Sequence, residues 1–322
     1  MPEAIRDWAR SSPEHEHHVL WPASNCRDDD VFESQTALPD LVCLQFRAVS
    51  RLASRIDARV VHAHSSKAGV LVRLARRSGA TIYQPHCFAY EDLGRSLFAR
   101  WCIRAVEKLL VPRTALLVAL TAREESLARG LGHTRISRVR NISKFQGASV
   151  KSVSKSGIPK VVMSGRVCRQ KDPEFFAQCA RIARTRGLRV QFVWLGDGPA
   201  GERRVLEEAG VEVTGWLGER EIADFLSTAA IYLHSAGYEG FPLSVLDAVA
   251  FGLPVLARRI PAFDGVEVMT FGEPIEAIQV IERMGIDADF VDQLRARSKA
   301  LNDVFTSDLQ RADISRALEP IS

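Results

Sequence analysis

The sequence predicts an α/β protein of two doubly wound domains, on three observations. Short β-branched runs alternate with helical patterns along the chain, as they do in parallel sheets flanked by helices. The chain has 322 residues, which is about twice the usual size of one domain. A stretch rich in Ser, Gly and Lys, residues 143–159, has no apolar periodicity and separates the two halves as a linker.

Local patterns set the expected boundaries. We expect an N-terminal domain over residues 1–142, a C-terminal domain over 160–305, and a last helix over 306–322 that packs back on the N-terminal domain. The chain opens with a helical pattern at Ala4–Arg10, and a strand pattern follows at His18–Trp21. Further runs of strand length, with helical patterns between them, are Arg59–His64, Ala80–Gln84, Ala115–Leu120, Lys160–Ser164, Arg189–Leu195, Val211–Thr214, Ile231–His234 and Pro254–Ala257.

Composition narrows the classes of function. Apolar residues make up 46% and charged residues 25% of the chain, which is typical of a globular protein with a buried core. The net charge of +4 is modest and the charges are interspersed, so no nucleic-acid surface is indicated. No apolar run of membrane-spanning length and no signal peptide is found, and we expect the chain in the cytosol. The six cysteines form no C-x-x-C pair, and no metal is expected.

One helical stretch, residues 96–112, is both basic and amphipathic. Arg100, Arg104 and Lys108 share one face at i, i+4 spacing, and Trp101 adds an aromatic side chain. Such a helix can lie on an anionic membrane surface. A surface helix that packs on its own sheet is the other interpretation and the one that we favour, because amphipathic surface helices are common. Spacing and composition leave both interpretations open.

The strongest chemical signal is the stretch 239–256, EGFPLSVLDAVAFGLPVL. Gly240 allows a tight turn and Pro242 suits the first turn of a helix, whose N-terminus then faces the edge where the strands end. The exposed N–H groups and positive dipole end at Phe241–Leu243 favour an anion such as phosphate. Glu239, just before the helix, can accept hydrogen bonds from hydroxyl groups, and Asp247 follows two turns later.

A second stretch, SGRVCRQKDPEFF at residues 164–176, follows an expected strand. Gly165 turns the chain, and Arg166 and Lys171 come before Asp172-Pro173 opens the next helix. A diphosphate needs paired cationic donors, for which Arg offers a planar fork of N–H groups and Lys a point charge. The two cations therefore predict a diphosphate site, and two solvated loop charges are the alternative.

These two stretches resemble retaining glycosyltransferases of family 4. The mark of that family is a Glu-x7-Glu pattern within EGFPL…EA…GLPV, and this chain carries Glu239-x7-Asp247, with a side chain one methylene shorter at the second position. The resemblance implies the GT-B fold, two Rossmann-like domains that face across a cleft. It also implies that Glu239 contacts the donor sugar and Asp247 the ribose hydroxyls, and that Arg166 and Lys171 hold the donor diphosphate.

The resemblance extends to further residues. Val213–Trp216 resembles the stretch whose backbone approaches the nucleotide base, and His86 takes the place of a histidine that reaches the donor sugar, with Cys87 where a glycine usually follows. The first strand and Gly-rich loop with which the family opens are missing from this sequence. The catalytic residues so implied are Glu239, Arg166, Lys171 and His86, and the donor-binding residues are Gly165, Arg166, Lys171, Gly215, Glu239, Gly240, Phe241, Pro242, Leu243 and Asp247.

The implied function is the transfer of a hexose, with retention, from a UDP- or GDP-sugar. The implied acceptor is a glycan or lipid-linked saccharide of capsule, exopolysaccharide or O-antigen type polysaccharide biosynthesis, and no metal or other cofactor takes part. That acceptor and the basic helix imply a peripheral protein at the inner face of the cell membrane.

Two alternatives stay open, a nucleotide-sugar epimerase of the GT-B fold and a non-catalytic partner subunit that binds a nucleotide sugar. The EGFPL stretch and the cation pair favour transfer, whereas the missing strand and Asp247 favour the partner subunit.

Overall fold

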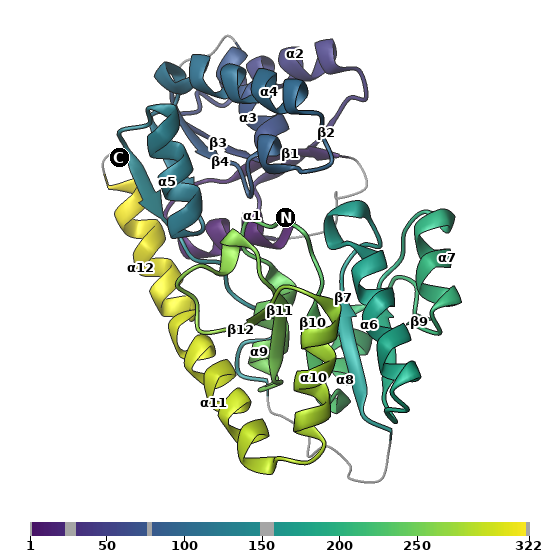
Figure 1. Ribbon diagram of the computed structural model, residues 1–322. Helices are drawn as coiled ribbons and strands as arrows, with labels where there is room; N and C mark the ends of the chain where they lie inside the picture. Colours follow the sequence, from purple (N-terminus) through teal and green to yellow (C-terminus); the bar gives the residue numbers. More distant parts are fainter. Residues whose placement is uncertain (1, 23–29, 76–78, 149–157, 320–322) are drawn as a thin grey trace. The chain divides into compact units, whose positions relative to one another are not determined.

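The computed structural model describes residues 2–22, 30–75, 79–148 and 158–319 (Figure 1). The chain divides into two compact units: unit 1 is Met1–Asn141 together with Ser307–Ser322, and unit 2 is Ile142–Thr306. Every strand pairing in the described sheets is parallel, so the expected α/β class is confirmed. Most of the expected linker, residues 149–157, lies outside the described residues.

Unit 1 contains the N-terminal elements and the last helix. In chain order they are α1 (Pro2–Ser11), β1 (His18–Pro22), β2 (Ser34–Leu38), α2 (Val42–Arg55), β3 (Val60–His64), α3 (Ser66–Leu74), β4 (Ala80–Gln84), η2 (Ala89–Glu91), α4 (Leu97–Leu109), η3 (Val111–Arg113), β5 (Leu116–Ala119), α5 (Ala122–Leu131), β6 (Ile136–Arg138) and α12 (Ser307–Leu318).

The strands of unit 1 lie in two separate sheets. β1 pairs with β2, and β3, β4, β5 and β6 pair in chain order. Helix α1 packs on both sheets, because Trp8 joins a cluster with Ile82 while Ala9 packs with Val19. Helix α12 closes the same cluster through Ile314, which is fully buried.

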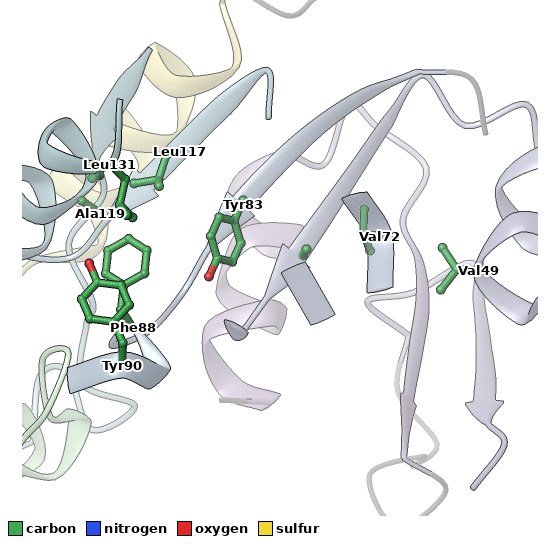
Figure 2. Packing of buried hydrophobic residues seen from close by; sticks show 10 residues of the cluster. Val49, Val72, Tyr83, Phe88, Tyr90, Leu117, Ala119 and Leu131 are labelled. Atoms are coloured by element: carbon green, nitrogen blue, oxygen red, sulfur yellow. The ribbon is translucent and has the colours of Figure 1, made fainter. Parts of the chain in front are cut away.

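The main core of unit 1 is built around the aromatic side chains that follow β4 (Figure 2). Phe88 stacks on Tyr90 with ring centroids 5.1 Å apart, and Tyr83 meets Phe88 edge to face at 6.3 Å. Leu117 and Ala119 of β5 pack against this group, and β5 is buried along its whole length.

A buried ion pair joins α3, β4 and α4. Arg73 Nη2 donates to Glu107 Oε2 at 2.7 Å, and the Tyr83 hydroxyl donates to Glu107 Oε1 at 2.8 Å. The Arg73 guanidinium also lies 4.0 Å from the centroid of the Tyr83 ring. Only glycine fits beside that ring at position 69, since a Cβ there would lie 2.4 Å from it. The carboxylate of Glu107 thus fixes α4 on the sheet.

Unit 2 is a single doubly wound sheet with its helices. Its elements are β7 (Lys160–Ser164), η4 (Arg169–Lys171), α6 (Pro173–Thr185), β8 (Gln191–Leu195), α7 (Ala200–Glu208), β9 (Glu212–Val213), α8 (Glu219–Thr228), β10 (Ile231–His234), α9 (Leu243–Ala250), β11 (Val255–Arg258), η5 (Pro261–Phe263), β12 (Met269–Phe271), α10 (Pro274–Met284) and α11 (Ala288–Val304). The strand order is β12-β11-β10-β7-β8-β9.

Helix starts follow local signals. Side-chain oxygens of Ser96, Thr121 and Asp172 accept hydrogen bonds from backbone N–H groups three residues later, at the starts of α4, α5 and α6. The expected strands occur, most with ends moved by one or two residues, whereas β2, β6 and β12 were not expected from the sequence. None of the described helices is long and apolar enough to cross a membrane.

Glu107→Ala should lower the free energy of unfolding of unit 1 by about 3–5 kcal/mol, because it leaves the Arg73 guanidinium buried without its counter-charge. Urea denaturation followed by circular dichroism measures this. Arg129→Ala is the matched control, since it removes one side of an ion pair whose arginine is 61% exposed, and it should change stability by less than about 0.5 kcal/mol. Equal effects of the two substitutions would contradict the role given to the buried pair.

Candidate functional site

The sheet of unit 2 has a topological switch point between β7 and β10. From β7 the chain proceeds outward through β8 and β9, and from β10 it proceeds to the other side through β11 and β12 (Figure 1). β7 and β10 pair directly, with Val161 beside Ile231. Ligands of open α/β sheets bind at such a point, outside the carboxyl ends of the strands. The loops that follow β7 and β10 therefore form the candidate site.

The loop after β7 is shaped by glycines. Gly165 has a φ of 145°, and a Cβ there would lie 3.1 Å from Lys171 Cε, so glycine leaves room for the lysine side chain. The Val167 N–H donates to the Asp197 carbonyl at 2.8 Å. At Gly198 a Cβ would lie 2.0 Å from the Val167 carbonyl oxygen. The turn after β8 thus holds the loop after β7 in place by close backbone contact.

Hydrogen bonds tie the loops after β7 and β10 together. The Gly237 N–H donates to the Gln170 carbonyl at 2.9 Å, and Ser235 Oγ donates to the Lys171 carbonyl at 2.7 Å. Gln170 Nε2 donates to the Tyr238 carbonyl at 3.2 Å. Because the two loops support one another, the side chains between them have defined positions.

Lys171 and Glu239 meet at this junction. Lys171 Nζ lies 2.5 Å from Glu239 Oε1, and Gln170 Nε2 donates to Glu239 Oε2 at 3.2 Å. The lysine and glutamate side chains are 16% and 10% exposed. The structure thus brings together two residues that the sequence singled out 68 positions apart. A cation for an anionic ligand and an acceptor for hydroxyl groups stand at the same edge.

Other expected donor-site residues surround this pair. Arg166 directly follows Gly165, and its side chain is exposed. Helix α9 begins at Leu243 with Pro242 as its N-cap residue, so the helix starts where the sequence predicted. Phe241 is buried and stacks on Phe305 with centroids 4.8 Å apart, which leaves its backbone, and not its ring, for any ligand. Gly240 is buried beside it.

Gly215 lies two residues after β9, the edge strand next to β8. Its φ is 76°, a conformation that favours glycine, and it forms an antiparallel bridge with Gly196. Trp216, which follows, is 68% exposed. The backbone of this turn is therefore open at the same edge of the sheet as the loops after β7 and β10.

Asp247 lies on α9 and is held from the start of unit 2. Ser143 Oγ donates to Asp247 Oδ1 at 2.8 Å. Burial raises the pKa of Asp247 to about 6, while the Ser143 hydrogen bond and the nearby Lys144 charge act in the opposite direction. The carboxylate is thus a poorly solvated acceptor that is mostly ionised at neutral pH.

In unit 1, His86 lies among histidines at the ends of β3 and β4. A hydrogen bond of 2.9 Å joins His86 Nε2 to His64 Nδ1, and the ring of His62 lies 3.9 Å from that of His64, centroid to centroid. Burial lowers the pKa of His86 to about 3 and that of His62 to about 3, so both rings are neutral at pH 7. No group of three or more metal-ligating side chains is placed to hold an ion within the described residues.

The backbone around His86 is strained. His86 and Cys87 have φ values of 53° and 89°, in a region that residues with a Cβ rarely adopt. Glu124 holds the strained turn, because the Cys87 N–H donates to its Oε1 at 2.8 Å and the Leu120 N–H donates to its Oε2 at 2.7 Å. The φ of Cys87 is one that glycine adopts freely, which fits the glycine of the resemblance at this position.

The basic helix expected at 96–112 is α4, and its outward face is largely apolar. Leu97, Phe98, Trp101 and Leu109 are 80%, 74%, 66% and 77% exposed. Arg100 does not join this face, because its Nε donates to the Tyr90 carbonyl at 2.7 Å.

The two cations that accompany the apolar residues on this face are Arg104 and Lys108, both exposed. We call Leu97, Phe98, Trp101, Arg104, Lys108 and Leu109 the α4 face.

Sequence reasoning missed three residues of the site. Gln170 and Ser143 hold Glu239 and Asp247, and His234 lies at the end of β10 with its Nε2 3.9 Å from Glu239 Oε1. Gln170 stands inside the quoted motif next to Lys171, which was a usable signal. Nothing in the periodicity marks Ser143 or His234 as neighbours of the motif residues.

Two family models match the chain, one on each unit. A glycosyl transferase 4-like domain matches residues 10–142, and glycosyl transferases group 1 matches residues 158–284. The chain is 22% identical over 277 residues to a 41.2 kDa protein of the cps region of Klebsiella pneumoniae, and the match covers 79% of this chain and 76% of that protein.

Two further relatives are described by what they act on or bind. The UDP-Gal:alpha-D-GlcNAc-diphosphoundecaprenol alpha-1,3-galactosyltransferase of Escherichia coli is 26% identical over 229 residues, which cover 62% of this chain and 58% of that enzyme. The crystal structure of Anabaena Alr3699/HepE with UDP and glucose has a TM-score of 0.80 at 15% identity and covers 99% of this chain and 96% of that one.

The matched domains and the architecture together define the class of protein. The chain has the GT-B fold, and it is a glycosyltransferase that carries a glycosyl transferase 4-like domain in unit 1 and a group 1 domain in unit 2.

The pKa of Asp247 leads to a stability prediction. The pKa of about 6 in the folded protein lies above the usual aspartate pKa of 3.8, so the folded state binds a proton more tightly, and stability rises as the pH falls from about 6 toward 4. Above pH 7 the ionised carboxylate is unfavourable, and Asp247→Asn should then be the more stable protein by roughly 1–3 kcal/mol. Thermal unfolding of both proteins from pH 4 to 8 measures this difference, and a constant difference across that range would contradict it.

Proposed function

We propose that the chain is a retaining hexosyltransferase of glycosyltransferase family 4 that uses a nucleotide diphosphate sugar as donor. The observation that carries this proposal is the meeting of the Lys171 ammonium and the Glu239 carboxylate at the switch point of unit 2. Phosphate oxygens need the cation, and sugar hydroxyls need the acceptor. A donor that carries both a phosphate and sugar hydroxyls therefore fits the edge of the unit 2 sheet at which the two side chains meet.

The proposed chemistry is electrostatic. When the bond between the sugar and the diphosphate breaks, negative charge develops on the departing phosphate. Lys171, Arg166 and the N-terminal N–H groups of α9 are the groups proposed to stabilise that charge, and Glu239 orients the sugar hydroxyls. Asp247, held by Ser143, accepts hydrogen bonds from the ribose hydroxyls. We assign no metal to this reaction.

The acceptor is proposed to be a glycan or lipid-linked saccharide of polysaccharide biosynthesis. The Escherichia coli relative is named for a diphosphoundecaprenol-linked sugar, and the Klebsiella pneumoniae relative for the cps region. HepE supports a uridine donor, because its crystals hold UDP. In unit 1, His86 is the residue proposed to contact the donor sugar, on a strained turn that Glu124 holds in place.

The donor site can be tested by ligand stabilisation and turnover in the presence of a chelator. UDP or GDP should raise the melting temperature of the wild type, and one of their hexose derivatives should be hydrolysed or transferred. Arg166→Ala should weaken nucleotide binding about 10–100-fold through loss of a charged hydrogen bond. Glu239→Gln should keep nucleotide binding and lose turnover. Lys299→Ala, which removes an exposed cation of α11, is the control and should change neither. Stabilisation by no nucleotide would contradict the proposal.

The divided sheet of unit 1 favours one other candidate, a non-catalytic partner that binds a nucleotide sugar. β1-β2 and β3-β4-β5-β6 share helix α1, yet no described strand joins the two sheets. The same experiment separates the two candidates. Nucleotide binding without any turnover, in the presence of acceptor extracts, supports the partner and excludes the enzyme.

We also propose that the α4 face contacts an anionic membrane surface, as expected of a peripheral protein with a lipid-linked acceptor. Its four apolar side chains are all more than half exposed, and Phe98 and Trp101 stack on one another at 6.3 Å. Arg104 and Lys108 supply the charge that anionic headgroups attract.

Vesicle flotation tests the membrane contact. Vesicles with phosphatidylglycerol should retain the wild type, and Trp101→Ser or the pair Arg104→Glu and Lys108→Glu should each reduce retention several-fold, since apolar insertion and surface charge act together. Arg100→Ala is the control, because that side chain is engaged by the Tyr90 carbonyl and lies off this face. Equal retention on neutral vesicles, or no loss in these variants, would show that the surface is not a lipid contact.

A further inference from the structure

His234 is a buried histidine without hydrogen-bond partners in the described structure. It is the last residue of β10, its side chain is fully buried, and both ring nitrogens lack a hydrogen bond there. Its ring stacks on Tyr232 at 6.2 Å and meets Phe263 edge to face at 5.8 Å. An apolar side chain would fill this place without the cost of two unsatisfied nitrogens. A buried polar group of this kind points to another state of the protein, in which one of the ring nitrogens makes a hydrogen bond.

The unpartnered ring stands next to the Lys171–Glu239 pair. His234 Nε2 is 3.9 Å from Glu239 Oε1, the same oxygen that lies 2.5 Å from Lys171 Nζ. The distance is too long for a hydrogen bond, and a small turn of the carboxylate toward the ring closes it. In the state described here, the lysine holds that oxygen.

Binding of a donor gives the Lys171 ammonium a second anionic partner. On the proposed function, its ammonium is the partner of the donor diphosphate, which competes with Glu239 for the same N–H donors. Glu239, 10% exposed, would then keep Gln170 on one oxygen and lose the donor on the other. A buried carboxylate that loses a donor is strongly unfavourable unless another replaces it. His234 Nε2, which is unpartnered in the described structure, lies 3.9 Å from the oxygen that loses its donor.

We propose that His234 is a positioning residue for Glu239: when Lys171 turns to the donor diphosphate, the Nε2–H group of His234 donates to Glu239 Oε1 and holds the carboxylate against the donor sugar. This inference rests on the proposed function for the role of the donor, and on the geometry of His234, Glu239 and Lys171 for the exchange of partners.

The charge state of His234 suits this exchange. Burial, together with the charge of Lys171, holds the pKa of His234 well below its usual value of 6.5, so the ring is neutral at pH 7. A neutral ring donates one N–H and adds no second positive charge that would draw the diphosphate away from Lys171. The neutral ring can therefore take the place of Lys171 at Glu239 without competing with Lys171 for the diphosphate.

The first test needs no activity. Lys171→Met removes the ammonium, so Glu239 should turn to His234, and the two side chains should become coupled. A double-mutant cycle with His234→Phe and Glu239→Gln, read by melting temperature, should give a coupling near zero in the wild-type background and about 2–4 °C in the Lys171→Met background. Equal coupling in both backgrounds would overturn the exchange of partners.

The second test uses the donor that the wild type turns over. His234→Phe should lower kcat/KM for that donor about 10–100-fold while changing the Kd of the free nucleotide less than about 3-fold, because the proposed contact of Glu239 is with the donor sugar, which the free nucleotide lacks. His234→Gln, whose amide can donate from the place of Nε2, should restore most of the loss. A fold defect would lower nucleotide binding as well, and equal losses in both variants would overturn the proposal.

His133→Phe is the matched control, because His133 is also buried with an unpartnered Nε2 but lies in unit 1. It should leave both constants unchanged. Should the wild type turn over no donor, the proposed function fails, and the melting-temperature cycle still decides whether His234 and Glu239 exchange partners.

Discussion

The pairing of β7 with β10 is the constraint on which the candidate site of unit 2 depends. The two strands are neighbours in the sheet although about 70 residues separate them in the chain, and the chain leaves them in opposite directions. Their carboxyl ends therefore meet with no strand between them, and the loops that follow share backbone hydrogen bonds. Without this pairing, Lys171 and Glu239 would stand on unrelated parts of the surface.

The backbone of the loops at the candidate site is closely packed. Close contacts of Gly165 and Gly198 leave little room for the loops to move, and Asp172 is anchored by Arg258 Nη1 at 2.6 Å. Within this frame Lys171, Glu239 and His234 make up a set in which one carboxylate oxygen has two neighbouring nitrogen donors at different distances.

In unit 1, as in unit 2, buried polar side chains lie at a loop that follows a strand. Three neutral histidines lie on β3 and just after β4, and the strained residues at 86 and 87 are fixed by the buried Glu124. Burial raises the pKa of Glu124 to about 7, while the hydrogen bonds from the Leu120 and Cys87 N–H groups act in the opposite direction. The aromatic core of unit 1 stabilises this domain by apolar burial (Figure 2).

The sequence by itself determined the α/β class, the buried strands and the motif residues, because these depend on local periodicity and on residue types at fixed spacing. It missed β2, β6 and β12, which are short, polar or half-buried strands whose pattern is weak. Only the tertiary structure decided that Lys171 pairs with Glu239 and that His234 lies beside Glu239 without a hydrogen-bond partner in the described structure. It also decided that Ser143 holds Asp247 across 104 residues and that Arg100 turns to the Tyr90 carbonyl. These contacts follow from the order of strands in a sheet and the course of loops, and no local pattern of residues encodes that order.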